Sequence, residues 1–129
     1  MERIETTAIR NLIHNEEYCR KVLPFIKEEY FTDRLEKLVF TQIYEFVNKY
    51  NNLPTKESLS IEMNSNKSVS EDEYKRMNEI ISSLNPEPIN LDWLVETTEV
   101  WCKDRAIHNA ILGGIQILDG KDKDHTPEY

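Results

Sequence analysis

The pair Gly120-Lys121 is the part of the sequence closest to a phosphate-binding motif. In the pattern GxxxxGK[ST], backbone N–H groups of a glycine-rich loop hold phosphates and a Ser or Thr hydroxyl binds Mg²⁺. That pattern needs glycine where this chain has Ile115, and Gly114 comes one residue too early. Asp122 occupies the Ser/Thr position, and a helical pattern precedes the motif in place of a strand. We therefore predict a helix followed by a charged tail, without a nucleotide cofactor.

The cysteines and two of the histidines have spacings that do not suit a metal site. His14 and Cys19 are five residues apart, and Cys102 and His108 are six apart. Two ligands on one helical face are usually three or four residues apart. Since the N-terminus lacks the apolar core of a secretory signal, both cysteines are predicted to be reduced thiols packed as small hydrophobic residues.

The carboxylates do not form a recognisable catalytic or calcium-binding pattern. Asp122, Asp124 and Thr126 resemble the start of a calcium loop, but Pro127 stands where that loop needs glycine. The clusters Glu16-Glu17, Glu28-Glu29 and Glu71-Asp72-Glu73 read as solvated helix starts, where acidic residues complement the helix dipole. Only three histidines could act as general bases, and none has a suggestive Ser or acidic partner in the sequence. We predict no catalytic, cofactor-binding or metal-binding residues, so this chain is not expected to be an enzyme.

Composition and charge narrow the class of protein further. The chain has 129 residues and a net charge of −8, which favours a single domain and disfavours strong direct binding to DNA. Residues 1–64 carry 11 acids and 9 bases, giving −2, and residues 65–129 carry 13 acids and 7 bases, giving −6. Only 3 glycines and 5 prolines argue against an all-β fold with many turns. No apolar run is long enough to span a membrane, and we expect a cytoplasmic protein.

The apolar pattern predicts an all-α fold with about six helices and no sheet. Residues 1–85 read as a small helical head of about five helices, 90–118 as one long helix, and 119–129 as a tail or linker. The clearest short helix covers 33–51, with Thr32 as its cap and Phe46 among its predicted core residues. Asn15 is predicted to end the first helix in a left-handed conformation. Ile61 is predicted to lie on the buried face of a helix that begins after residue 55.

The long helix has two apolar stripes, and each stripe needs a neighbour. One consists of Trp93, Val100, Ile107, Ile111 and Leu118, and the other of Leu91, Val95, Cys102 and Ala106. We predict that the first stripe is a subunit interface, since aromatic and aliphatic anchors carry most interface energy. The alternative is that it folds back onto the head as ordinary core, because a short domain needs every apolar contact.

The order of several short segments resembles a known family over residues 5–120. These segments are Ala8-Ile9-Arg10-Asn11-Leu12-Ile13, Glu17-Tyr18, Lys21-Val22-Leu23-Pro24-Phe25-Ile26, Glu29-Tyr30-Phe31, Phe40-Thr41-Gln42-Ile43, Lys49-Tyr50-Asn51-Asn52-Leu53-Pro54-Thr55, Trp93-Leu94-Val95, Thr98-Glu99 and Asp104-Arg105-Ala106-Ile107-His108-Asn109-Ala110. Together they resemble the N-terminal domain of the T-even-type phage replicative DNA helicases, hexameric helicases of the DnaB family.

The resemblance implies a helical head followed by a helical hairpin, of which the helix at 90–118 would be the first arm. In that family, paired hairpins build a collar that holds the subunits together as dimers and a hexamer and that docks the primase. ATP and Mg²⁺ would belong to a motor domain that this sequence lacks, so the resemblance implies a fragment of a longer protein. A free-standing small helical regulator that binds a protein partner is the alternative.

Overall fold

The computed structural model describes residues 3–118 of the chain, with side chains described as far as Gly114. The described residues form six α-helices and one short 3₁₀ helix, without a strand among them. The helices are α1 (Ile4–His14), α2 (Glu16–Val22), α3 (Arg34–Tyr50), α4 (Lys56–Asn64), α5 (Glu71–Ser83) and α6 (Leu91–Leu118), and the 3₁₀ helix is η1 (Glu28–Tyr30). The predicted all-α class, with five helices ahead of one long helix, is confirmed. The tail predicted at 119–129 lies outside the described residues.

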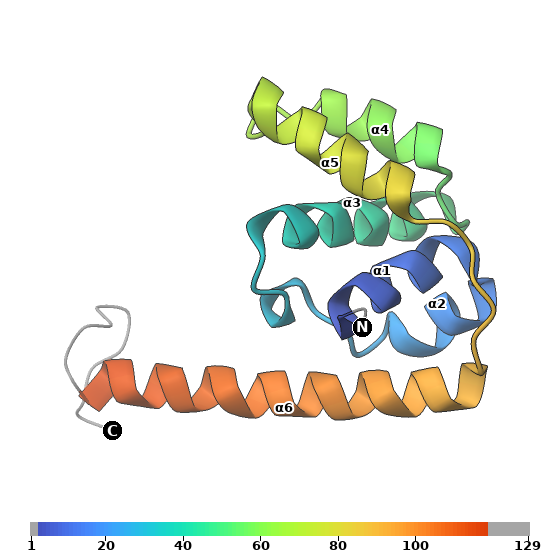
Figure 1. Cartoon of the computed structure of the whole chain (residues 1–129). Coiled ribbons are helices and arrows are strands. Elements are labelled where there is room, and N and C mark those ends of the chain that lie inside the picture. The colour runs from blue at the N-terminus through green and yellow to red at the C-terminus, as the bar shows by residue number, and fades with distance from the viewer. Residues whose placement is uncertain (1–2, 119–129) are drawn as a thin grey trace.

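The helices stack in successive layers, as Figure 1 shows. The α4–α5 pair packs on α3, α3 packs on α1 and η1, and α1 and α2 pack on α6. The core passes through these layers and includes the fully buried side chains of Leu12, Tyr18, Phe40 and Leu94. A single apolar interior therefore joins the head to the first half of α6.

Local sequence signals explain where most of the helices begin. Thr55 and Ser70 each form a capping box. The side chain of the cap residue accepts a hydrogen bond from the backbone N–H of the third helical residue, and the side chain of that residue accepts one from the backbone N–H of the cap. The Asn90 side chain accepts a hydrogen bond from the Trp93 backbone N–H at 2.9 Å and so begins α6. Asn51 ends α3 with φ 54°, in the left-handed region that Asn tolerates.

Two of the predicted caps are wrong. Asn15 is extended, and its side chain accepts from the Tyr18 backbone N–H, so it begins α2 and does not end α1 in a left-handed conformation. Asp33, and not Thr32, caps α3 by accepting from the Leu35 backbone N–H. In both cases more than one polar residue near the helix boundary could act as the cap, and the backbone conformation at that boundary decides which one does.

Two predicted core positions also differ in the structure. Phe46 is only half-buried and packs its ring against Tyr50, with 4.7 Å between centroids. Phe40 is the buried aromatic residue of α3, and its ring stacks on Phe31 at 4.9 Å. Ile61 is 67% exposed on the outer side of α4. Each of these side chains lies on a part of its helix that the neighbouring elements leave partly uncovered, so helical periodicity overestimates their burial.

Candidate functional site

The exposed side of α6 carries several large apolar side chains. Four predicted interface residues lie there with 54%, 58%, 59% and 57% of their surface exposed: Trp93, Val100, Ile107 and Ile111. The side chain of the fifth, Leu118, lies outside the described part of the chain. The four described residues therefore do not belong to the core of the head, contrary to the alternative considered above. Their use as a subunit interface stays a prediction.

The side of α6 that faces the head differs from the second predicted stripe. Leu94, Thr98 and Cys102 are buried, whereas Ala106, predicted to lie there, is exposed. Leu91 and Val95 of that stripe pack at the edge of the core. The head approaches α6 at an angle to the predicted stripe, and sequence periodicity does not define that angle.

Polar contacts fix α6 against the head near the middle of the docked segment. The Tyr18 hydroxyl and Thr98 Oγ1 are 2.7 Å apart, and Thr98 Oγ1 also donates to the Leu94 carbonyl at 2.7 Å. Both side chains are fully buried, and this burial raises the pKa of Tyr18 well above its usual range. Because the phenol stays neutral, it serves as a hydrogen-bond donor inside the core.

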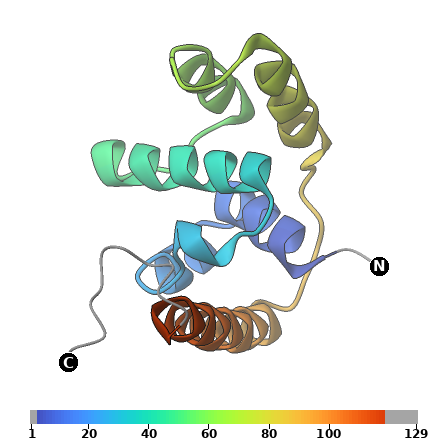
Figure 2. The ribbon, with the colours of Figure 1, turned by 90° about the vertical axis from the view of Figure 1, so that its left-hand side faces the viewer.

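A second set of contacts marks where α6 leaves the head. Arg105 Nε donates to the Tyr30 carbonyl and Asn109 Nδ2 donates to the Glu29 carbonyl, both at 3.1 Å. Leu112 follows Asn109 by about one turn but is 45% exposed. Figures 1 and 2 show α6 at the outer edge of the molecule, and Figure 1 shows its last turns extending past the head. We call the turns after Asn109 the arm.

A groove of about 430 Å³ lies where α6 begins and α1 approaches it. Its lining combines apolar, aromatic and acidic side chains: Ile4, Trp93, Glu96, Thr97, Val100, Trp101 and Asp104. Trp101 is half-buried, and its ring contacts those of Phe31 and Tyr30 edge to face at 5.2 and 6.2 Å. No local sequence pattern predicts this groove, because it depends on Ile4 from a helix far away in the chain.

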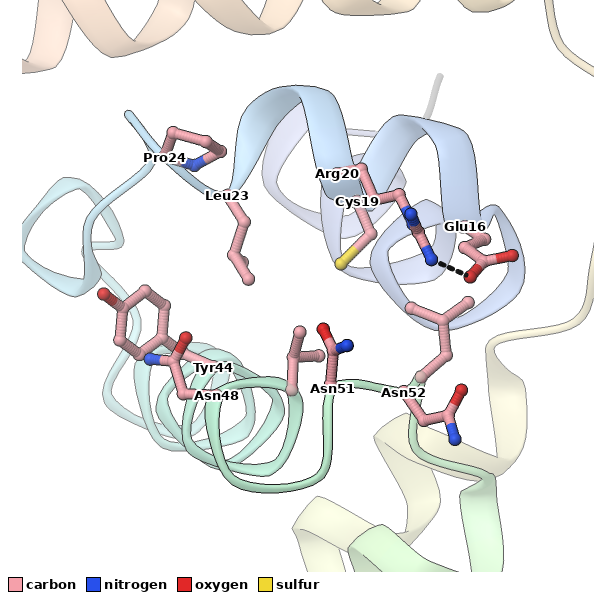
Figure 3. A pocket seen from close by; sticks show the side chains of 11 residues that line it. Glu16, Cys19, Arg20, Leu23, Pro24, Tyr44, Asn48, Asn51 and Asn52 are labelled. Carbon is pink, nitrogen blue, oxygen red and sulfur yellow. Dashed lines mark hydrogen bonds and ion pairs between the residues drawn. The ribbon is translucent and has the colours of Figure 1, made fainter.

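A second pocket, of about 270 Å³, lies between α2 and the end of α3 (Figure 3). Cys19 points into it from α2 and Leu23 from the residue that follows this helix, and Asn48, Asn51 and Asn52 form part of its polar edge. Burial raises the pKa of the Cys19 thiol to about 11. The thiol is therefore protonated at neutral pH, and the residues around it do not provide the base that a nucleophilic cysteine needs.

His14 connects two helices of the head. The His14 Nε2 atom lies 2.5 Å from the Leu84 carbonyl and ties the end of α1 to the end of α5. Within residues 3–118, no group of three His, Cys, Asp or Glu side chains is placed to hold a metal ion. None of the described helices is long and apolar enough to cross a membrane.

Comparison with known proteins agrees with the resemblance noted in the sequence. No protein-family model matches the chain. The chain is 34% identical over 109 residues to a DnaB-like replicative helicase of Enterobacteria phage T4. The matched region covers 84% of this chain but only 23% of that relative, so the chain spans about a quarter of the relative's length. The predicted resemblance to this type of helicase is confirmed over the matched region.

Proposed function

From the similarity of this chain to a phage DnaB-like replicative helicase, we propose that it is the N-terminal collar domain of such a helicase. In this proposal it assembles subunits into dimers and a hexamer and docks the primase during DNA replication in the host cytoplasm. In this proposal it has no catalytic role of its own, and ATP and Mg²⁺ would be bound by a separate motor domain.

The unpartnered side of α6 is the observation that carries the proposal. Four large apolar side chains on one side of one helix are each more than half exposed. Exposed apolar residues that form a continuous patch mark interaction sites, whereas single ones are ordinary. A matching stripe from another subunit would remove this surface from water, which favours association.

The arm gives the proposal a second support. The last hydrogen bonds between α6 and the head come from Arg105 and Asn109. Beyond them, Ile111 and Leu112 are exposed on different sides of the helix. Most helical stability in proteins comes from tertiary packing and not from propensity, so an arm of this kind is best explained by neighbours supplied by other segments or chains.

Substitution of two stripe residues tests the assembly. We expect the parent chain to sediment as a dimer or larger species at tens of micromolar, and Ile107→Asp/Ile111→Asp to sediment as a folded monomer, because a carboxylate is costly to bury in an apolar contact. Ile61→Asp is the matched control, since Ile61 is an exposed isoleucine on α4, far from α6. A parent chain that stays monomeric at high concentration refutes the assembly role.

Primase docking needs its own measurement. Calorimetric titration of the chain with the primase encoded by the same genome should give saturable binding, and its absence at tens of micromolar removes that part of the proposal. The reading frame provides a separate test of the collar assignment. It should continue beyond residue 129 into a strand–GxxxxGK[ST]–helix pattern, as a motor domain requires.

A further inference from the structure

The groove where α6 begins is lined by aromatic and acidic side chains, which are the types that bind cations. Both tryptophans of the chain, Trp93 and Trp101, line it. Trp93 is more than half exposed, so its indole face is available to a ligand. The carboxylates of Glu96 and Asp104 stand on the same rim, and both residues are exposed. An indole face attracts a Lys or Arg side chain, and nearby carboxylates add to that attraction.

The negative charge of this groove is not neutralised by the described part of the chain. Within residues 3–118, neither Glu96 nor Asp104 forms an ion pair. Arg3 is the basic residue next to Ile4, but its guanidinium is bonded to Glu5 and to Glu36, at 3.1 and 2.9 Å. Arg105 is turned toward the head, where its Nε donates to the Tyr30 carbonyl. An occupant that carries positive charge would therefore complement this groove.

A second copy of α6 does not supply that charge. Residues 91–105 hold four acids, Asp92, Glu96, Glu99 and Asp104, and two bases, Lys103 and Arg105, so their net charge is −2, whereas positions 106–118 contain no Asp, Glu, Lys or Arg. Parallel pairing of two copies would place acidic segments against each other, and antiparallel pairing would place them against uncharged segments. Neither arrangement is complementary in charge. The groove and the uncharged arm thus call for occupants of different chemistry.

The spacing along α6 defines what such an occupant would look like. Glu96, Val100 and Asp104 follow one another at intervals of four residues, so they form one ridge of the helix. The two acidic positions are about 12 Å apart along the axis, at about 1.5 Å per residue. A partner helix would match this ridge with two basic residues seven or eight positions apart and an apolar residue midway between them.

We propose that this groove binds a basic amphipathic helix of a partner protein. Its two Lys or Arg side chains pair with Glu96 and Asp104, one of them against the Trp93 indole, and its apolar residue packs on Val100. The inference rests on the proposed function in treating α6 as an interaction surface. It assigns Trp93 and Val100 to the partner helix and leaves Ile107 and Ile111 for contact between subunits, so it does not depend on self-association.

The probe is an 18-residue helical peptide in which one face carries Arg, Leu and Arg at intervals of four residues. A matched peptide has Glu in place of both Arg residues. The chain has only two Trp, so its two indole N–H signals in a ¹⁵N correlation spectrum report directly on the groove. We expect both signals to move with the basic peptide, to stay in place with the acidic one, and the affinity to fall as salt is added.

Substitutions that neutralise the carboxylates then distinguish recognition of charge from nonspecific hydrophobic binding. Glu96→Gln/Asp104→Asn should weaken binding of the basic peptide about tenfold, the loss expected for two surface ion pairs. Glu57→Gln/Glu79→Gln is the matched control, because it removes the same charge from exposed positions on α4 and α5 and should leave the affinity unchanged. The monomeric Ile107→Asp/Ile111→Asp chain should still bind the peptide, so failure of self-association leaves this test intact.

Three results would overturn the inference. Equal binding of the acidic peptide, or unchanged affinity in Glu96→Gln/Asp104→Asn, would show that charge does not select the occupant. Indole signals that move on dilution of the chain alone but not with peptide would show that a second copy fills the groove.

Discussion

The buried hydrogen bond between Tyr18 and Thr98 gives the sharpest test of how α6 is docked. Thr98 Oγ1 donates to the Leu94 carbonyl, so in the pair at 2.7 Å the Tyr18 hydroxyl is the donor. Thr98→Val keeps the shape of the side chain but leaves this buried hydroxyl without an acceptor. Tyr18→Phe removes the donor, and Thr98 keeps its bond to Leu94. The two single changes are therefore not equivalent.

The expected free energies of unfolding follow from this asymmetry. Thr98→Val should cost about 1–3 kcal/mol, the penalty of leaving a buried polar group unsatisfied. Tyr18→Phe should cost about 0.5–1.5 kcal/mol, the net value of an ordinary hydrogen bond. In the double variant both partners are apolar, so it should be more stable than Thr98→Val alone. Adding Tyr18→Phe to Thr98→Val is thus expected to restore stability.

Urea denaturation followed by far-UV circular dichroism measures all four corners of this cycle. Thr97→Val is a matched control, since Thr97 lies next to Thr98 but is only half-buried, and its effect should stay within about 0.5 kcal/mol. A double variant less stable than Thr98→Val, with additive single effects, would mean that the two hydroxyls do not meet. The docking of α6 described above would then be wrong.

Three further predictions concern the core, the thiols and DNA. Phe40→Ala should cost about 3–5 kcal/mol because Phe40 is only 2% exposed, and Phe46→Ala should cost at most half of that by the same denaturation assay; equal costs would contradict the burial described. Burial raises the pKa of Cys19 to about 11 and of Cys102 to about 12, so the thiols stay protonated in the fold while those of the unfolded chain ionise above about pH 9. This contribution to stability is present below pH 9 and is lost as pH rises toward 11, and replacing both cysteines by Ala should flatten the decline in urea midpoints over that range. Because the net charge is −8, fluorescence anisotropy should detect little binding to single-stranded DNA at physiological salt; tight binding with a steep salt dependence would reveal a basic patch.

Helix positions were predictable where a local signal was unambiguous. Ser70 with Glu73, and Asn90 ahead of an apolar run, specify helix starts by bonds within four residues, and the structure forms these bonds. The exact caps of α2 and α3 were not predictable, because neighbouring polar residues compete and tertiary packing selects one. Burial was predictable on the inner layers and overestimated on the outer ones, as Ile61 illustrates.

The candidate surfaces divide in the same way. The stripe from Trp93 to Ile111 was visible in the sequence, because helical spacing alone places those residues on one side. The exposure of the stripe could not be predicted from the sequence, since it depends on whether the head covers that side of the helix. The groove at Ile4 and the pocket at Cys19 need helices that are distant in sequence, and no local pattern encodes such a juxtaposition.

The continuity of α6 has a geometric consequence for any assembly of this chain. The helix runs without a break from Leu91 to Leu118, a length of about 42 Å at about 1.5 Å per residue. Because Arg105 and Asn109 bond it to the head, the head moves with the stripe as one body. Sliding two paired stripes by one turn would displace the heads by about 5.4 Å, and by one heptad about 10.5 Å. The side-chain register of the stripe would thus allow only certain distances between the heads, which differ by whole helical turns or heptads.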